Sequence, residues 1–334
     1  MIAAGKAPDA AAPLATDSDS TGHWLLTSAG AKVDLIQRMR RALNSAGCCL
    51  YAADSSPLSA AFSFADGHLL LPGLEDECFV PRLIDACIKR QIKVVLPTRD
   101  ADLLFFARHR AVFEAAGIRP LVSALESIEL CRDKIRFHAH CLQNGVPVLP
   151  RIECPSAGDF PCFVRPRVGA ASAGAGRIQN LAHMHALYGE PPWEDLLVQS
   201  CCRDDEFSID ALFGTDGEVV QWIARQRIRV KAGESVVSRT VRLPAFEPVI
   251  NTLASSMRLF GPITLQAFFS PENGVHLIEI NPRFGGACAL GNEAGLEAPE
   301  RLVAFVQGDM ENFYRLRPLR YDLTLLRYSQ DLFI

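Results

Sequence analysis

The sequence lacks the marks of several large protein classes. It has no apolar run near the roughly 20 residues that a helix needs to span a bilayer, which argues against a membrane protein. Its 34 basic and 38 acidic residues leave a net charge of −4, without the basic excess of a nucleic-acid-binding surface. The 11 cysteines are odd in number and include no Cys-x-x-Cys pair. We therefore expect free thiols in a reducing compartment, the cytoplasm.

Two common phosphate-binding motifs are also missing. No Gly-x-Gly-x-x-Gly follows the first expected strand, which disfavours a classical dinucleotide-binding fold. No Gly-x-x-x-x-Gly-Lys-Ser/Thr occurs in the chain, which excludes a P-loop.

What the chain does have is the composition of a globular protein with several packed units. It has 334 residues, 49% of them hydrophobic, and a mean hydropathy of +0.11. Residues 1–21 are rich in Ala, Pro, Asp and Ser without the apolar core of a signal peptide, so we expect a disordered tail there. We expect three units after it, at residues 22–120, 121–195 and 196–334.

Strands and helices alternate through residues 22–120, which predicts an α/β unit with a parallel sheet. From the spacing of apolar residues, strands are expected at 23–27, 48–53, 68–71 and 92–96, and helices at 33–46, 79–90 and 102–116. Polar turns follow three of the strands, at 27–30, 54–57 and 97–100. Ligands of parallel sheets bind at such ends, although strand ends are polar in most proteins.

The next unit combines two basic residues with a loop of small residues. A helix is expected at 126–144, with Lys134 in its first half, and Arg165 ends a strand at 162–165. Small residues then fill 169–176 before a strand that begins at Ile178. Small residues let backbone N–H groups approach phosphates closely. Together with two cations, the pattern favours a triphosphate site over the alternative, a flexible hairpin connection.

Residues 196–334 read mainly as antiparallel strands. Strands are expected at 196–199, 206–213, 218–225 and 262–269, and a helix at 248–260. Arg225 and Arg227 alternate onto one strand face, where they could bind a substrate carboxylate or serve as solvated charges of an edge strand.

The run from Val275 to Gly286 carries the most informative pattern. Glu279 and Asn281 are two apart on an expected strand, so their oxygens share one face and suit Mg²⁺ or Mn²⁺. Across the preceding hairpin, Gln266 can complete the donor patch, and Arg283 could hold a phosphoryl group. A solvated edge strand explains Glu279 and Asn281 equally well if they are considered alone.

These spacings resemble those of the ATP-grasp ligases, above all the ATP-binding units of carbamoyl-phosphate synthase large chains and stand-alone carboxylate–amine ligases built like them. The resemblance runs from Trp24 onward, and Gln266 with Glu279-x-Asn281-Pro282-Arg283 is its most specific part. It implies an α/β chain that is α+β in its C-terminal half. A Rossmann-like pre-ATP-grasp domain at 22–120 would precede an ATP-grasp fold of two subdomains, a small one at 121–195 and a C-terminal one at 196–334.

The resemblance also implies an ATP site with Mg²⁺ or Mn²⁺. It assigns the metal to Gln266, Glu279 and Asn281, and catalysis to Arg283, Lys134 and Arg165. Nucleotide contacts fall to Lys134, Arg165, Gly169, Ser172, Gly174, the adenine hinge at Gln199 and Ser200, and Glu206 at the ribose. Substrate is expected near Arg225, Arg227, Gly285 and Gly286. Arg165 stands where the family usually has Lys, and Gln199 where Glu is commoner.

The expected activity is the ADP-forming ligation of a small-molecule carboxylate to an amine through an acyl phosphate. Two alternatives stay open: phosphorylation of a carboxylate without ligation, and a nucleotide-binding regulator without turnover. No nucleic acid or membrane partner is expected, and the family makes a homodimer possible.

Overall fold

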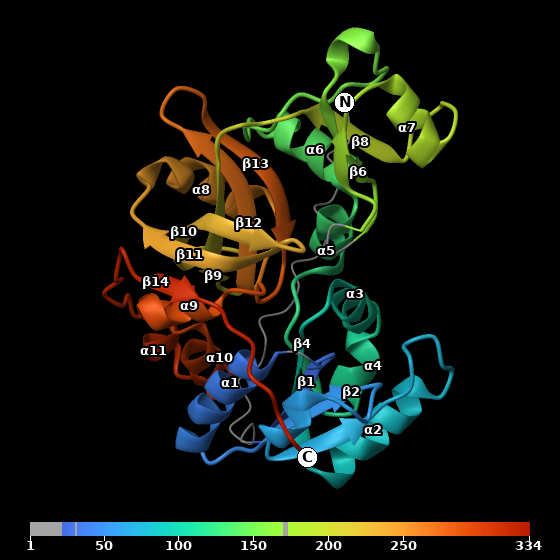
Figure 1. The fold of residues 1–334 in the computed structure, drawn as a ribbon. Coiled ribbons are helices and arrows are strands. Elements are labelled where there is room, and N and C mark those ends of the chain that lie inside the picture. Colours follow the sequence, from blue (N-terminus) through green and yellow to red (C-terminus); the bar gives the residue numbers. More distant parts are fainter. Residues whose placement is uncertain (1–21, 31, 170–172) are drawn as a thin grey trace, which may run out of the picture.

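The computed structural model describes residues 22–30, 32–169 and 173–334. The tail expected at 1–21 and the loop residue Ser172 lie outside the described residues. Figure 1 shows the first sheet at the bottom of the view, a long antiparallel sheet in the middle and a small sheet at the top.

The first sheet is five-stranded and parallel throughout, as predicted, in the order β3-β2-β1-β4-β5. Its strands are β1 (His23–Thr27), β2 (Leu50–Asp54), β3 (Gly67–Leu70), β4 (Ile92–Pro97) and β5 (Arg119–Pro120). Its helices are α1 (Val33–Ser45), α2 (Phe79–Lys89), α3 (Asp100–Arg108) and α4 (Arg110–Ala115), and a 3-10 turn spans Ala60–Ser63. The central strands are apolar on both faces because helices cover both, and Leu25 and Leu26 are fully buried.

Two helices that the sequence predicts as continuous are each broken. The helix expected at 102–116 is divided at His109 into α3 and α4, and the one expected at 126–144 into α5 (Leu125–Arg132) and α6 (Lys134–Gln143). At the second break Asp133 is extended (φ −94°, ψ 97°), and its carboxylate accepts hydrogen bonds from the N–H groups of Ile135 and Arg136 at 3.2 and 3.0 Å. Asp133 thus caps a new helix, which apolar periodicity does not reveal.

A three-stranded antiparallel sheet follows, in the order β7-β6-β8. It contains β6 (Cys162–Pro166), β7 (Gly176–Ile178) and β8 (Leu196–Ser200), with α7 (Leu181–Tyr188) and a 3-10 turn at Ala157–Asp159. The strand predicted to begin at Ile178 ends there instead, because Asn180 caps α7 by accepting from His183 N–H. Pairing with β6 places β8 in this sheet, although the expected unit boundary lies just before it. The unit boundaries stay a prediction.

The largest sheet has six strands in the order β13-β12-β9-β10-β11-β14, all antiparallel. Its strands are β9 (Asp205–Phe213), β10 (Val219–Lys231), β11 (Glu234–Val241), β12 (Gly261–Ser270), β13 (Gly274–Asn281) and β14 (Thr324–Leu326). Helical segments are α8 (Glu247–Ser256), α9 (Ala289–Gly291), α10 (Ala298–Val306) and α11 (Met310–Tyr314), a 3-10 turn at Pro244–Phe246 and a π-turn at Asn292–Leu296.

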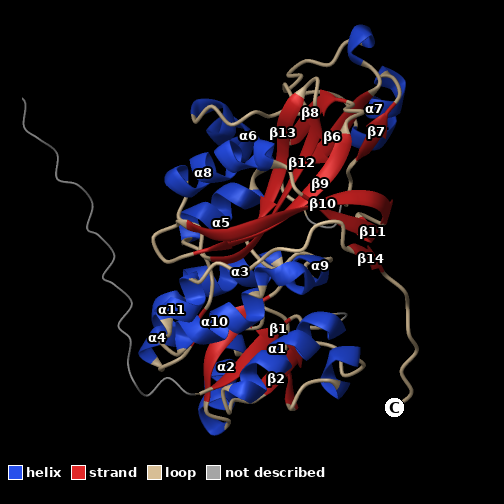
Figure 2. Ribbon diagram, turned by 90° about the vertical axis from the view of Figure 1, so that its left-hand side faces the viewer, coloured by secondary structure: helices blue, strands red, loops and turns tan. Residues whose placement is uncertain are grey.

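The two faces of this sheet differ in polarity. Phe207, Ile209 and Leu265 point to one face and pack with residues of α8 such as Ile250 in a buried apolar cluster. Figure 2 shows α8 and α5 on that side of the long strands. Since side chains alternate along a strand, the intervening polar residues gather on the opposite face. That face is where the candidate site lies.

A single apolar cluster joins the first and last parts of the chain. Leu26 and Met39 from the parallel unit belong to the same buried cluster as Leu302 and Phe313 near the C-terminal end. The guanidinium of Arg119 also lies 4.6 Å from the ring centre of Phe305. The C-terminal helices are therefore part of the core of the N-terminal unit.

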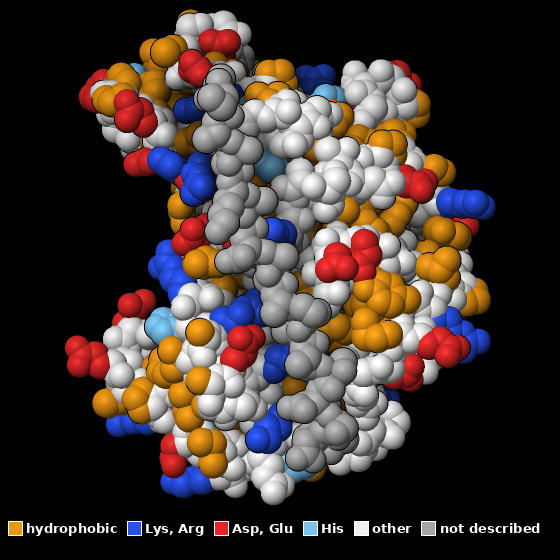
Figure 3. Space-filling view, turned by 180° about the vertical axis from the view of Figure 1, so that it is seen from behind, with side chains coloured by type: hydrophobic (Ala, Val, Ile, Leu, Met, Phe, Trp, Pro, Cys, Tyr) orange, Lys and Arg blue, Asp and Glu red, His pale blue; other side chains and the backbone are white. Residues whose placement is uncertain are grey.

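The surface and the thiols agree with the composition. Seen from behind, basic and acidic side chains are interspersed, without a continuous field of one sign (Figure 3). All 11 cysteines are free. None of the described helices combines the length and apolarity of a membrane span.

Candidate active site

The polar face of the six-stranded sheet carries the predicted metal ligands. Gln266 pairs with Glu279 across the β12–β13 hairpin, as predicted, and with Ser208 on the other side. Thr264 pairs in the same way with Asn281. Residues directly opposite each other share a face. The structure therefore brings the oxygen donors Gln266, Glu279 and Asn281 to one side of the sheet.

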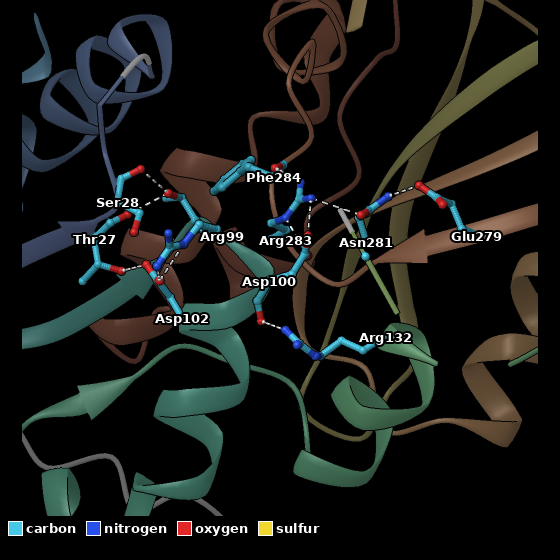
Figure 4. Close-up of polar contacts among 12 residues, drawn as sticks. Thr27, Ser28, Arg99, Asp100, Asp102, Arg132, Glu279, Asn281, Arg283 and Phe284 are labelled. Atoms are coloured by element: carbon cyan, nitrogen blue, oxygen red, sulfur yellow. Dashed lines mark hydrogen bonds and ion pairs between the residues drawn. The ribbon is translucent and has the colours of Figure 1, made fainter. Parts of the chain in front are cut away.

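Asn281 lies between Glu279 and Arg283 (Figure 4). Its Nδ2 donates to Glu279 Oε1 at 3.0 Å, and its Oδ1 accepts from Arg283 Nη2 at 3.1 Å. The Glu279 side chain is 28% exposed, so its carboxylate can be reached from solvent. One carboxylate with amide oxygens fits Mg²⁺ that arrives with phosphate oxygens. The described residues hold no cluster of three or more His, Cys, Asp or Glu that suggests another metal site.

Arg283 is paired with an acid from the N-terminal unit. Its Nε and Nη2 donate to the two carboxylate oxygens of Asp100, both at 2.8 Å. Asp100 is the first residue of α3 and the last residue of the polar turn that follows β4. Strand β13 ends at Asn281, so Arg283 reaches Asp100 from the following turn and not from the strand.

Arg165 and Gln199 form a buried pair behind Glu279. Arg165 Nη2 donates to Gln199 Oε1 at 2.7 Å, Gln199 Nε2 donates to the carbonyl oxygen of Leu149 at 2.7 Å, and Arg165 Nη1 lies 3.9 Å from Glu279 Oε2. Burial lowers the pKa of Arg165, against the opposing effect of Glu279. Because a carboxylate could not donate to Leu149, the amide at position 199 fits this arrangement better than Glu.

Lys134 begins α6 and faces the same site. Its Nζ donates to the carbonyl oxygen of Gly169 at 3.0 Å, which ties it to the small-residue loop. Burial lowers the pKa of Lys134, whereas Glu279 raises it and Arg165 lowers it further. These couplings place Lys134 within electrostatic reach of the candidate metal ligand.

The small-residue loop joins β6 and β7, as predicted. Gly174 has a φ of +68°, and a Cβ there would lie 3.0 Å from Pro166 Cγ. A side chain would therefore be strained at this position. Tyr188 Oη donates to the carbonyl oxygen of Gly174 at 2.7 Å.

The predicted ribose and hinge residues lie at the near ends of β8 and β9. Ser200 is exposed where β8 ends. Glu206 Oε1 lies 3.0 Å from Arg227 Nε. Burial raises the pKa of the Glu206 carboxyl, Arg227 opposes this, and Glu279 adds to it. Glu206 and Glu279 therefore share one electrostatic environment, although they lie on strands separated by β12.

Arg225 is the most deeply buried of the predicted arginines, and its guanidinium is paired with a buried carboxylate. It is 2% exposed, and its Nε and Nη2 donate to the two carboxylate oxygens of Asp210 at 2.7 and 3.1 Å. Asp210 also accepts from Thr264 Oγ1 at 3.3 Å. Arg225 Nη1 has no hydrogen-bond partner.

Gly285 and Gly286 form a close-packed turn after β13. A Cβ on Gly285 would lie 2.6 Å from Thr264 Oγ1, and one on Gly286 would lie 3.1 Å from Glu234 Oε1. The carbonyl oxygen of Gly286 also accepts a hydrogen bond from Arg327, next to β14. The close approach of the Thr264 side chain thus explains why Gly285 lacks a side chain, whereas the Glu234 side chain near Gly286 is flexible enough to move away.

Comparison with family models identifies both parts of the chain. Residues 24–121 match a model described as the PylC-like N-terminal domain. Residues 192–324 match a model described as ATP-grasp in the biosynthetic pathway with Ter operon. Residues 192–324 therefore form an ATP-grasp unit. Among curated proteins, none matches the sequence.

Solved structures with the same ATP-grasp fold are distant in sequence. Biotin carboxylase from Campylobacter jejuni is 13% identical with a TM-score of 0.68, and the match covers 91% of this chain and 75% of that one. L-amino acid ligase from Bacillus licheniformis is 16% identical with a TM-score of 0.66, and the match covers 88% and 77%. At such identities the likeness shows the fold.

The chain spans only part of some larger proteins with this fold. Against pyruvate carboxylase from Rhizobium etli the TM-score is 0.66 at 16% identity, and the match covers 86% of this chain but 28% of that one. Each of these likenesses is one of fold.

Two residues that contact or lie near Arg283 in the candidate site could not be assigned from the sequence. Asp100 was visible only as part of a polar strand-end turn, because nothing in the sequence links it to Arg283. Lys32, the residue directly before α1, donates through Nζ to the carbonyl oxygen of Thr98 and interacts electrostatically with Arg283. The three polar turns do meet at one edge of the sheet: Thr98 Oγ1 donates to the Thr27 carbonyl at 2.7 Å, and Gly30 N–H donates to Asp54 at 2.8 Å.

Proposed function

We propose that this chain is a carboxylate–amine ligase that uses ATP with Mg²⁺ or Mn²⁺, forms ADP and works through an acyl phosphate. One observation carries the proposal: oxygen donors and cations from separate elements meet around Glu279. Gln266 and Asn281 lie on the same sheet face, Arg165 approaches from β6, and Arg283 contacts Asn281. Such a set neutralises a polyphosphate chain and keeps it in place.

In this proposal the nucleotide contacts come from several parts of the chain, and one of them, Ser172, lies outside the described residues. Lys134, Arg165 and the loop with Gly169, Ser172 and Gly174 would hold the phosphates. The backbone at Gln199 and Ser200 would contact adenine, and Glu206 the ribose hydroxyls. Gln266, Glu279 and Asn281 would hold the metal ion, which supplies positive charge at the β- and γ-phosphates.

The chemistry needs no covalent nucleophile from the protein. A carboxylate oxygen attacks the γ-phosphorus, the bond from that phosphorus to the bridging oxygen breaks, and ADP leaves. The amine then attacks the acyl carbon, phosphate leaves with the bonding electrons, and the amine loses a proton. Arg283, Lys134 and Arg165 neutralise charge during phosphoryl transfer. Loss of one such group should raise the barrier by about 3 kcal/mol.

The substrates would lie beside the end of β13 and the turn that follows it. Arg227 and the Gly285–Gly286 turn would border this region, and Arg225 would support it through its ion pair with Asp210. The identities of the carboxylate and the amine are left to experiment. The free thiols are in keeping with a cytoplasmic enzyme. A homodimer stays a prediction.

A screen for ADP release tests the proposal. The purified chain is incubated with Mg²⁺, ATP and a library of carboxylates and amines, singly and in pairs. The proposal expects release that requires both substrates. Release with a carboxylate alone would mean a kinase, and tight ATP binding without any release would mean a regulator; either result would contradict the ligase.

An isotope experiment then tests the acyl phosphate. The carboxylate found in the screen is labelled with ¹⁸O, and the released phosphate is analysed by mass spectrometry. Transfer of one ¹⁸O atom to phosphate is expected, because the attacking carboxylate oxygen stays with the phosphorus when the amine displaces it. Unlabelled phosphate would exclude this intermediate.

A further inference from the structure

The Asp100–Arg283 pair links the N-terminal unit to the turn after the metal strand. The two residues are 183 positions apart and are joined by two hydrogen bonds of 2.8 Å in a bidentate pair. Both side chains are mostly buried, with exposures of 18% for Asp100 and 19% for Arg283. A bidentate pair fixes the orientation of a guanidinium as well as its position.

Asp100 is itself held from the opposite side. Arg132, the last residue of α5, donates from Nη1 to the carbonyl oxygen of Asp100 at 2.9 Å (Figure 4). Two residues further on, Asp102 is 1% exposed and accepts from Thr27 Oγ1 at 2.8 Å. The start of α3 is therefore anchored to both β1 and α5, so that Asp100 is a rigid support for Arg283.

The hydrogen bonds of Arg283 show which contact can persist when a metal binds. Its Nε and Nη2 donate to the Asp100 carboxylate, and Nη2 also donates to Asn281 Oδ1. Its Nη1 donates to the carbonyl oxygen of Phe284 at 3.3 Å. A divalent cation at Asn281 would repel the guanidinium from the same oxygen. Asp100 then remains as the side chain that orients Arg283, whose fifth N–H, on Nη1, is free to meet a phosphoryl oxygen.

We propose that Asp100 is a positioning residue of the active site, which holds Arg283 in line with the transferred phosphoryl group. The N-terminal unit thereby contributes to phosphoryl transfer without touching the nucleotide. This role rests on the proposed function, because it requires Arg283 to act on the γ-phosphate.

The test compares binding of a ground-state and a transition-state mimic. Titration calorimetry measures the dissociation constants of Mg²⁺ with the non-hydrolysable analogue AMP-PNP, and of Mg²⁺, ADP and aluminium fluoride, which imitates the phosphoryl group in transfer. The variants are Asp100→Asn, Arg283→Gln and the double variant. Glu129→Gln is the matched control: it removes the Arg108–Glu129 pair, a 2.8 Å contact between α3 and α5 outside the site.

Asp100→Asn should leave AMP-PNP binding within roughly threefold of the parent and weaken the fluoride complex by about tenfold or more, because positioning matters most in the transition state. The double variant should bind the fluoride complex no worse than Arg283→Gln alone. Equal weakening of AMP-PNP binding and fluoride-complex binding in Asp100→Asn would indicate structural damage. Unchanged binding of the fluoride complex, or losses of affinity that add up in the double variant, would show that Asp100 does not act through Arg283. Each of these outcomes overturns the inference. If Asp100→Asn fails to fold, Asp100→Glu replaces it and is judged by the same two ratios.

The parent protein separates failure of the inference from failure of the proposed function. A parent that does not bind Mg²⁺ with AMP-PNP contradicts the ATP site itself, and the role of Asp100 falls with it. A parent that binds both ligands while Asp100→Asn matches it contradicts the role of Asp100 alone.

Discussion

Lys32 is a half-buried cation near the Asp100–Arg283 pair. Burial and, to a smaller extent, the charge of Arg283 lower its pKa to about 8, against the opposing effects of Asp102, Asp100 and Cys288. Its ammonium group is therefore held in a folded environment that disfavours its charge. This places a titrating amine at the edge of the parallel sheet that faces the site.

Replacing Lys32 by Met should change how stability depends on pH. The pKa of Lys32 is about 8 in the folded parent and 10.5 in the unfolded chain. Between these two pH values the unfolded chain binds more protons than the folded one, so the free energy of unfolding rises with pH. Relative to Lys32→Met, the parent should gain about 1 kcal/mol per pH unit in this window. Urea unfolding of both proteins at several pH values measures this; parallel curves would show that Lys32 keeps its ordinary pKa.

At the level of elements, patterns within short stretches of sequence predicted strands and hairpins, whereas contacts between distant stretches could not be predicted. The short hairpin between β12 and β13 brings Gln266 near Glu279, and a one-residue register shift next to Gln266 sets the two directly opposite each other. The hairpin could be predicted from the sequence, whereas the register shift could not. The Arg165–Gln199 and Asp100–Arg283 pairs join distant parts of the chain, and no local pattern announces them. The helix breaks were missed because apolar spacing continues across them.

Asp133 shows how such a break serves the site. Its carboxylate caps α6 and also accepts from Arg167 Nε at 2.8 Å, while the N–H of Lys134 donates to the Arg167 carbonyl at 2.9 Å. Burial raises the pKa of Asp133, but the hydrogen bonds from Arg167 and the Arg136 N–H outweigh this and lower it. The cap therefore stays charged down to acid pH and fixes the first turn of the helix that carries Lys134.

Asp133→Ala should lower the free energy of unfolding by about 1–2 kcal/mol, because it removes the cap of α6. The loss should shrink in acid, as pH falls through the lowered pKa of Asp133 and the parent carboxylate becomes protonated. Denaturant unfolding at neutral and acid pH measures both effects. Asp159→Ala, which removes an exposed capping carboxylate in a short 3-10 turn, is the comparison. Equal stability of the parent and Asp133→Ala at neutral pH would contradict the capping role.

At the scale of the whole molecule, two kinds of contact unite the three sheets. A polar series runs from Gln199 through Arg165, Glu279, Asn281 and Arg283 to Asp100, with contacts from 2.7 to 3.9 Å. The apolar cluster around Leu302 joins the parallel unit to the C-terminal helices. Alternation of strands and helices predicted the parallel unit, but not that distant helices complete its core.

Leu302→Ala should destabilise the protein by about 2–5 kcal/mol, because it leaves a cavity in this shared cluster. The unfolding temperatures reported by a probe in the N-terminal unit and by a probe in the C-terminal unit should fall together, since the cluster belongs to both. Leu142→Ala is the control, because Leu142 is 60% exposed on α6. Scanning calorimetry decides the matter: a shift confined to one of two separate transitions would show that the units do not share a core.

The most direct measurement concerns the proposed metal and nucleotide site at Glu279. Calorimetry of AMP-PNP binding, with and without Mg²⁺, is performed on the parent, on Glu279→Gln and on Glu272→Gln, which changes an exposed residue of the β12–β13 turn. Mg²⁺ should tighten binding to the parent and to Glu272→Gln by roughly tenfold or more, and Glu279→Gln should lose this gain because the only carboxylate of the donor set is gone. An unchanged Mg²⁺ dependence in Glu279→Gln would contradict the account.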